Sequence, residues 1–282
     1  MKILITGSSG QLGSELRELF GESSGHELYF MDSKQLPLEQ TMIIQDILGM
    51  YQPELIIHAA AYTAVDKAES EPQRADQVNH LASEEIAQYC RLHGAKLLAI
   101  STDYVFDGLS AEPLSEDAPV GPISVYGKTK LLGEAAIQKW APEYLIIRTS
   151  WVYSTYGNNF VKTMIRLMTE RDRISVVADQ IGSPTYARDL ATAIIHIIET
   201  GNWKNGIFNF SNEGEISWYD FAVAIRDLKG LDCTINAIPT ADYPTAAARP
   251  KYSLLDKTKI KDSFGVEVPY WKDSLVAMLG RM

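Results

Sequence analysis

The sequence predicts an α/β protein: a Rossmann-type, doubly wound parallel sheet with a smaller, mixed C-terminal lobe. Three observations support this. Short apolar segments alternate with helix-like segments through the first half of the chain, which is typical of βαβ units. A glycine-rich loop directly follows the first apolar segment. The alternation loosens after Ser150, so we expect one domain over residues 1–150 and a lobe over residues 151–282, some segments of which return to the sheet.

Five apolar segments are expected to form the parallel sheet. They are Lys2–Thr6, Glu27–Asp32, Glu54–Ala60, Lys96–Thr102 and Tyr144–Ser150. Their apolar residues are nearly continuous, as in strands that are buried on both faces. Helical segments such as Gln77–His93 lie between them. Right-handed crossovers would place the carboxyl ends of the strands along one edge, where ligands bind in this architecture.

The second half of the chain predicts a less regular set of elements. "ISVVAD" and "GIFNFSN" are strand candidates, Leu190–Thr200 is a strongly apolar helix, and "SWYDFAVAIRDL" is a capped helix. The aromatic residues Trp218, Tyr219 and Phe221 in that last segment are expected in the core. The proline-rich stretch Ala237–Asp256 shows little periodicity and predicts a long loop, of a length that is usually functional.

Composition excludes several classes of function. A chain of 282 residues that is 46% hydrophobic can bury a large core. A net charge of -10 argues against a nucleic-acid surface. The apolar run at the N-terminus is too short for a signal peptide, and no segment of about 18 apolar residues predicts a membrane span. Cys90 and Cys233 are isolated, so we expect a cytoplasmic protein without disulfides.

The loop "TGSSGQLG" predicts a dinucleotide-binding turn. Gly7 permits a sharp turn, Gly10 allows the backbone to approach a pyrophosphate, and Gly13 allows a helix to pack closely on the strand. Amide groups at the start of the helix would then face the phosphates. The alternative is an ordinary tight turn between a strand and a helix, which needs at most two of these glycines.

Asp32 ends the second strand candidate, about 20 residues past this loop, where a carboxylate can accept hydrogen bonds from ribose hydroxyls. The alternative is a solvated carboxylate at a strand end. Lys34 lies just beyond and would tolerate a 2′-phosphate, so the residues leave the choice between NADH and NADPH open.

The segment "SVYGKTK" places Tyr126 and Lys130 four residues apart, on one face of a predicted helix. An ammonium beside a phenol favours the phenolate and lowers its pKa, so such a tyrosine can transfer a proton near neutral pH. Thr102 ends the fourth strand candidate and offers a hydroxyl for a substrate carbonyl. The alternatives are a surface Tyr–Lys pair and a Thr-Asp turn at a strand end. The five histidines show no spacing that would suit a metal.

Several longer blocks together resemble a known family. They are "AAAYTAVDKAESEP", "STDYVFDG", "VYGKTKLLGE", "RTSWVY", "GNNFVKTM", "DQIGSPT" and "YPTAAARP". Together with the "TGSSGQLG" opening, they are similar to the dTDP-4-dehydrorhamnose reductases, which are extended short-chain dehydrogenases/reductases acting on nucleotide sugars. The resemblance runs from residue 1 to about Trp271. It implies reduction of the C4 ketone of dTDP-4-dehydro-L-rhamnose with NADPH or NADH.

The resemblance also implies roles for individual residues. Tyr126 would donate the proton, Thr102 would hold the reacting oxygen, and Lys130 would hold the nicotinamide ribose and tune the tyrosine. The remaining cofactor contacts would be Gly7, Gly10, Gln11, Leu12, Gly13, Asp32, Ala61, Tyr62 and Thr63. The substrate would contact Thr102, Asp103, Tyr126, Trp151, Asn159 and Arg249.

Three other functions are compatible with the same fold: a dehydratase, an epimerase and a non-catalytic regulatory subunit. In dehydratases of this superfamily the threonine is followed by Asp-Glu. Here Thr102 is followed by Asp103 and Tyr104, so the second acid is missing, which argues against dehydration. An epimerase would keep its cofactor tightly bound. Regulatory subunits of methionine adenosyltransferase also resemble this family, but we expect them to relax the Tyr-x-x-x-Lys pattern that is intact here.

The resemblance further bears on metal binding and assembly. Some dehydrorhamnose reductases dimerise around a magnesium ion held by three glutamates. The first corresponds to Glu15, the second falls on Arg188, and the chain ends "MLGRM" without the third. Asp189 is adjacent to Arg188 but should point elsewhere, since one helical residue turns a side chain by about 100 degrees. We therefore expect no metal site, and a monomer or a weak dimer.

Overall fold

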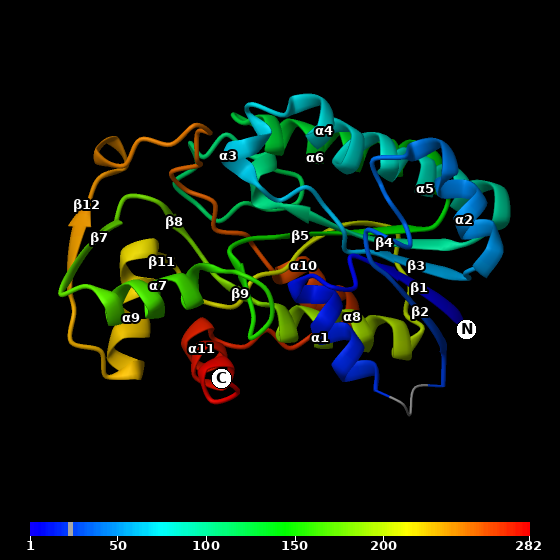
Figure 1. Ribbon diagram of the computed structural model, residues 1–282. Coiled ribbons are helices and arrows are strands. Elements are labelled where there is room, and N and C mark those ends of the chain that lie inside the picture. Colours follow the sequence, from blue (N-terminus) through cyan, green and yellow to red (C-terminus); the bar gives the residue numbers. More distant parts are fainter. Residues whose placement is uncertain (22–24) are drawn as a thin grey trace.

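A computed structural model describes residues 1–21 and 25–282 of the chain (Figure 1). Its centre is a six-stranded sheet in the order β10-β5-β4-β3-β1-β2, in which every neighbouring pair is parallel. The strands are β1 (Lys2–Thr6), β2 (Glu27–Met31), β3 (Leu55–His58), β4 (Lys96–Thr102), β5 (Tyr144–Thr149) and β10 (Gly206–Asn209). The doubly wound parallel sheet predicted from the sequence is confirmed.

The strand register brings together the polar residues at the carboxyl ends. Thr6 pairs with His58 across β1 and β3, and Thr102 pairs with Thr149 across β4 and β5. Strand order reverses between β1 and β3, because β2 lies on the far side of β1. This reversal opens a crevice at the carboxyl edge, which is where ligands bind in open α/β sheets.

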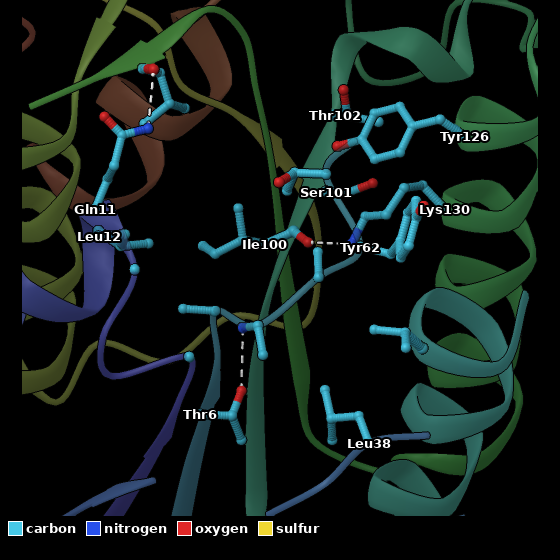
Figure 2. Close-up of a pocket in the computed structure, with 18 of the residues that line it drawn as sticks. Thr6, Gln11, Leu12, Leu38, Tyr62, Ile100, Ser101, Thr102, Tyr126 and Lys130 are labelled. Carbon is cyan, nitrogen blue, oxygen red and sulfur yellow. Dashed lines mark hydrogen bonds between the residues drawn. The ribbon is translucent and has the colours of Figure 1, made fainter. Parts of the chain in front are cut away.

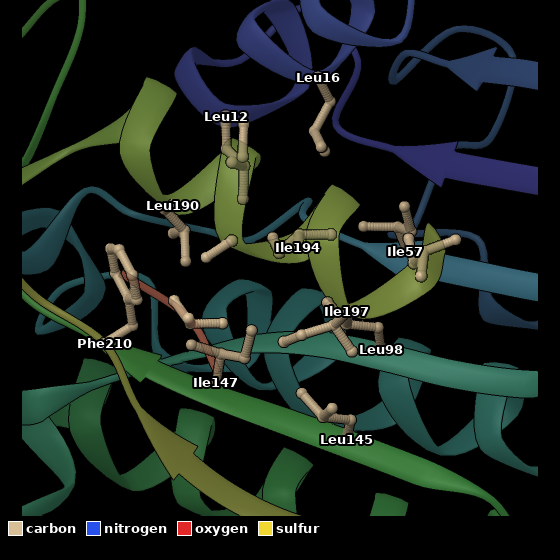
Figure 3. Packing of buried hydrophobic residues seen from close by; sticks show 14 of the residues in the cluster. Leu12, Leu16, Ile57, Leu98, Leu145, Ile147, Leu190, Ile194, Ile197 and Phe210 are labelled. Atoms are coloured by element: carbon tan, nitrogen blue, oxygen red, sulfur yellow. The ribbon is translucent and has the colours of Figure 1, made fainter. Parts of the chain in front are cut away.

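Two helical layers cover the sheet (Figure 1). On one face lie α1 (Gln11–Phe20), α8 (Ala187–Thr200) and α10 (Thr258–Phe264), whose apolar residues pack against Ile57, Leu98 and Ile147 of the sheet (Figure 3). The other face carries α2 (Ile44–Tyr51), α5 (Ala82–His93) and α6 (Val125–Trp140). Strands covered on both faces account for the continuous apolar runs in the sequence.

The predicted helical segment Gln77–His93 is helical throughout, but its first turn is a π-helix and not an α-helix. The segment directly follows α4 (Pro72–Asp76), forms a π-helix over Gln77–Leu81 and continues as the regular helix α5. A Cβ placed on Gly133 of α6 would lie 2.2 Å from the carbonyl oxygen of Asn79. Because the two backbones approach this closely, α6 is seated directly on the π-helical turn.

A second group of elements lies beside the sheet. It contains α7 (Phe160–Glu170), α9 (Trp218–Lys229), α11 (Trp271–Leu279) and the parallel pair β7 (Arg173–Val177) and β12 (Thr234–Ile238). Trp218, Tyr219 and Phe221 pack in or against its own apolar cluster. As predicted, α9 is capped. The Ser217 hydroxyl accepts from the amide of Asp220, and the Asp220 carboxylate accepts from the amide of Ser217.

Two segments of the second half return to the sheet. β10 pairs with β5 at the sheet edge, and α8 packs with α1 in the same apolar cluster (Figure 3). The prediction that the domains divide at residue 150 stays a prediction. The stretch Ala237–Asp256 contains one short helix, η4 (Thr240–Asp242), among the described residues and is otherwise mainly loop.

The remaining short elements are η1 (Thr41–Ile43), α3 (Val65–Ala68), η3 (Asp103–Val105), β6 (Val152–Tyr153), β8 (Ile181–Gly182), β9 (Thr185–Tyr186) and β11 (Ile216–Ser217). Outside the undescribed residues 22–24, none of the helices has the length and apolar character that crossing a membrane requires.

Candidate active site

A cleft of about 1030 Å³ opens at the carboxyl edge of the sheet. Its lining comes from the loops after β1, β2, β3, β4 and β5 and from the start of α6 (Figure 2). Most residues predicted for the site line this cleft: Gly7, Gly10, Gln11, Leu12, Asp32, Ala61, Tyr62, Thr63, Thr102, Asp103, Tyr126, Lys130 and Trp151. Three predicted residues, Gly13, Asn159 and Arg249, do not line it.

The glycine loop leaves room for a ligand against its backbone. Gly7 has a φ of 69°, and a Cβ there would lie 2.8 Å from Cα of Ala60. A Cβ on Gly13 would lie 2.3 Å from the carbonyl oxygen of Gly7, so Gly13 serves close packing behind the cleft. Gly10 and the first residues of α1, Gln11 and Leu12, line the cleft, so the start of this helix faces it, which suits the phosphates of a dinucleotide.

Asp32 lies at the β2 end of the cleft. Its Oδ1 accepts hydrogen bonds from the amides of Lys34 (2.8 Å) and Gln35 (3.1 Å), and these bonds lower the pKa of the carboxyl group. Lys34 is exposed and is not among the residues that line the cleft. Of these two charged side chains, Asp32 lines the cleft and Lys34 does not.

Tyr126 is held at the start of α6. Ser124 caps this helix by accepting from the amide of Gly127 (3.1 Å), and the phenol lies near the Thr102 side chain. The Thr102 hydroxyl in turn donates to Oδ1 of Asp103 (3.1 Å). Figure 2 shows Tyr126 and Thr102 together at one end of the cleft, with Lys130 beside them. The structure thus unites the three predicted catalytic residues.

The predicted pKa of Tyr126 is wrong in direction. Burial raises the pKa of Tyr126 to about 12, and the neighbouring Thr102 hydroxyl opposes this only in part. Lys130 does not reverse the effect, because its ammonium donates to the carbonyl oxygen of Ile100 (2.7 Å). Burial also lowers the pKa of Lys130 to about 8, against the opposing charge of Glu134. Tyr126 is therefore protonated at neutral pH, as a proton donor must be.

Asp103 is a buried carboxyl group on the cleft wall. Among the described residues its Oδ2 has no hydrogen-bond partner. Burial raises the pKa of Asp103 to about 6, while hydrogen bonds from Ser253 and Thr102 act in the opposite direction. An orphan acceptor in such a position suits a ligand hydroxyl.

Asn79 is a structural member of the site that sequence reasoning missed. Its Oδ1 accepts from the amide of Tyr62 (2.8 Å), and its Nδ2 donates to the carbonyl of Tyr62 (3.2 Å) and to Oγ1 of Thr129 (3.1 Å). Thr129 donates to the carbonyl of Tyr126 (3.0 Å). Asn79 thus joins the loop after β3 to the helix that carries Tyr126. The sequence did contain one signal for this role: an asparagine, which is unfavourable inside a helix, stands in the middle of a predicted helical segment. In the structure Asn79 lies in the π-helical turn.

Asn159 and Arg249 have internal partners. Asn159 caps α7 and donates to Oε1 of Gln11 (2.9 Å), which links that helix to the glycine loop. Arg249 forms a two-point ion pair with Asp66, at 2.9 and 2.6 Å, and so holds the Ala237–Asp256 loop against α3. Substrate contacts from these two residues stay predictions.

Glu15 is fully buried and surrounded by cationic donors. Its carboxylate accepts from Ser154 (2.6 Å), from Arg188 (3.2 Å) and from Arg281 (3.2 Å). Asp189 instead accepts from Asn212 and Ser274. Sequence reasoning noted the missing acid in "MLGRM" but missed the pairing of Arg281 with Glu15. Within the described ranges, no group of three or more His, Cys, Asp or Glu residues is placed to hold a metal ion.

Comparison with known proteins agrees with this geometry. A family model described as the RmlD substrate binding domain matches residues 1–282. The dTDP-4-dehydrorhamnose reductase of Aggregatibacter actinomycetemcomitans is 43% identical over 97% of this chain and 97% of its own length. This chain belongs to the dTDP-4-dehydrorhamnose reductase family.

Solved structures of the dTDP-4-dehydrorhamnose reductase family share the entire fold. The Clostridium acetobutylicum protein superposes with a TM-score of 0.96 at 40% identity, covering 100% of this chain and 99% of the other. The Bacillus anthracis protein, solved in complex with NADP, has a TM-score of 0.95 at 40% identity, with 100% and 99% covered.

Proposed function

We propose that this protein reduces the C4 ketone of dTDP-4-dehydro-L-rhamnose to give dTDP-L-rhamnose, using NADPH or NADH. The observation that carries the proposal is the placement of Tyr126, Thr102 and Lys130 in the same cleft as the glycine loop. A proton donor and a dinucleotide cradle at one carboxyl edge suit coupled proton and hydride transfer.

The chain's own residues fit the cofactor. The glycine cradle and the start of α1 would hold the pyrophosphate, Asp32 the adenosine ribose, and Ala61, Tyr62 and Thr63 the middle of the dinucleotide. When bound and reduced, the nicotinamide supplies the hydride. The NADP complex of the Bacillus anthracis relative supports this assignment.

Tyr126 and Thr102 would bind the ketone oxygen of the substrate. Their two hydroxyl groups can both donate to an oxygen that gains negative charge, which stabilises the transition state more than the ground state. Tyr126 then gives up its proton to that oxygen and becomes a phenolate. The Lys130 ammonium would bind the nicotinamide ribose and favour the phenolate by its charge.

Asp103 and Trp151 would complete the substrate site. The orphan Oδ2 of Asp103 suits a sugar hydroxyl, and the Trp151 indole offers an apolar surface. Contacts from Asn159 and from Arg249, whose guanidinium suits a diphosphate, are part of the same proposal.

The direct test follows absorbance at 340 nm with NADPH or NADH plus dTDP-4-dehydro-L-rhamnose. We expect the absorbance to fall only when both the cofactor and the sugar nucleotide are present, and the purified protein to carry less than stoichiometric cofactor. If neither NADPH nor NADH is oxidised, the proposal is contradicted. Tightly bound, stoichiometric NAD would instead favour an epimerase.

We further propose that the protein works in the cytoplasm as a monomer or weak dimer. Both cysteines, Cys90 and Cys233, are free and buried, which suits a reducing compartment. Glu15 is neutralised within the chain by Arg188 and Arg281, so it is not available to share a cation with a second subunit.

A further inference from the structure

Trp151 has an unusual backbone conformation for a bulky residue. Its φ is 48°, in the left-handed region, where Gln52 is the other non-glycine residue of the described chain. A tryptophan pays a steric cost in this conformation, and such outliers gather at functional sites. Trp151 lines the cleft directly after β5, in the same cavity as Thr102 and Tyr126. The conformation therefore aims a large aromatic side chain at the site.

The backbone on both sides of Trp151 is fastened to the loop around residue 184. The Ser150 hydroxyl donates to the carbonyl of Ser183 (2.7 Å), and the amide of Thr185 donates to the carbonyl of Trp151 (3.3 Å). Val152 then pairs with Thr185 in the short β6–β9 ladder. These bonds hold the main chain, but they leave the direction of the indole undetermined.

The indole itself is held by Trp218. The two rings stack with centroids 3.7 Å apart and planes inclined by 14°. Gly182 also contacts the ring, since a Cβ there would lie 3.1 Å from Cζ2 of Trp151. Trp218 is in turn fixed by the Phe160 ring, 4.6 Å away, and by its place at the first residue of the capped helix α9.

Trp218 is not one of the residues that line the cleft. Its link to the cleft is its stack on Trp151, which does line it. This distinguishes Trp218 from a residue that only fills the core.

We propose that Trp218 is a positioning residue, which holds the strained Trp151 indole as the aromatic wall of the sugar-nucleotide site. The inference rests on the proposed function and deepens it. Without the Trp218 ring, the indole is free to leave the cleft wall, because its left-handed backbone no longer has a stacked partner to compensate the strain. Substrate affinity should suffer while the machinery for proton transfer stays intact.

The test compares Trp218→Ala with Trp218→Phe. We expect Trp218→Ala to raise KM for dTDP-4-dehydro-L-rhamnose about tenfold, a change of about 1.4 kcal/mol in binding, with KM for NADPH unchanged and kcat within about threefold. Trp218→Phe retains an aromatic ring and should recover most of the affinity. Trp203→Phe is the matched control, because it alters a tryptophan that packs on the central sheet cluster rather than on Trp151.

Circular dichroism supplies a readout that does not depend on turnover. Two stacked indoles couple their electronic transitions, so we expect an exciton couplet that is present in the wild type and in Trp203→Phe and is lost in Trp218→Ala. Loss of the couplet with an unchanged sugar-nucleotide KM would overturn the proposal, as would a similar KM increase for NADPH. If the wild type itself fails to oxidise NADPH with this sugar nucleotide, the proposed function fails, whatever the couplet shows.

Discussion

Arg148 and Glu134 form a two-point ion pair in the interior, with Nε–Oε1 at 3.0 Å and Nη2–Oε2 at 2.7 Å. Their side chains are only 3% and 1% exposed. Arg148 lies on β5 and Glu134 on α6, one helical turn after Lys130. The pair therefore anchors the helix that carries Tyr126 and Lys130 to the central sheet.

Removing the charge of one partner of this buried pair should destabilise the folded protein. We expect Glu134→Gln to lower the free energy of unfolding by about 3 kcal/mol or more, since Arg148 would be left as a buried charge without its partner. Urea unfolding followed by circular dichroism measures this. Glu170→Gln is the control, because its pair with Arg166 is more than half exposed on both sides and should contribute less than about 0.5 kcal/mol. Equal losses in the two variants would contradict the argument.

Tyr126→Phe tests the proton donor. The substitution removes the hydroxyl near Thr102 and leaves the ring in place. We expect kcat to fall by about 10²-fold or more, the usual scale for general acid catalysis, with the Kd of NADPH nearly unchanged. Steady-state rates and fluorescence titration of the cofactor provide the two numbers. Near-normal turnover would remove Tyr126 from the mechanism.

Asp32→Ser tests cofactor choice. Asp32 lines the cleft and repels a 2′-phosphate, so the wild type should use NADH at least comparably with NADPH. The variant should shift the ratio of kcat/KM values toward NADPH about tenfold, while Lys34→Ala, outside the cleft lining, should change it little. A wild-type preference for NADPH above about 100-fold, or about 2.7 kcal/mol, would show that Asp32 does not face the ribose.

Asp103 makes the stability of the protein depend on pH. Its folded pKa, about 6, is raised from the ordinary 3.8, so the folded state favours the protonated form. The stabilising effect of that proton is complete below about pH 4 and is lost as pH rises through 6.

Asp103→Asn removes this titration. We expect the variant to gain stability over the wild type by an amount that grows by about 1 kcal/mol between pH 5 and pH 8, as measured by urea unfolding at both values. The same variant should bind the sugar nucleotide less tightly. A stability difference that is independent of pH would show that Asp103 titrates normally.

Chelation should leave the enzyme active. Glu15 and Glu18 of α1 are both paired with Arg188 and Arg281, and a hard cation needs carboxylates that are free to bind it. We expect the 340 nm rate to be unchanged in EDTA, and light scattering to give the same mass before and after chelation. A dimer that dissociates in EDTA with loss of activity would contradict this prediction.

The local chemistry of the chain was enough to predict the sheet and much of the site. Continuous apolar runs, the glycines at positions 7, 10 and 13, and the Tyr126–Lys130 spacing depend on neighbouring residues, and their consequences follow from strand burial and helix periodicity. Thr102 and Asp103 could be placed at a strand end because the carboxyl ends of parallel strands share one edge of the sheet.

Tertiary structure alone decided the features that depend on distant partners. The pKa of Tyr126 rises because other segments exclude water from its hydroxyl, and burial cannot be read from a four-residue spacing. Arg281 meets Glu15 across 266 positions of sequence. Trp151 has a left-handed backbone, and its partners there, Trp218 and the loop around residue 184, come from distant parts of the chain. Such contacts are set by how the layers pack, which no local pattern in the chain records.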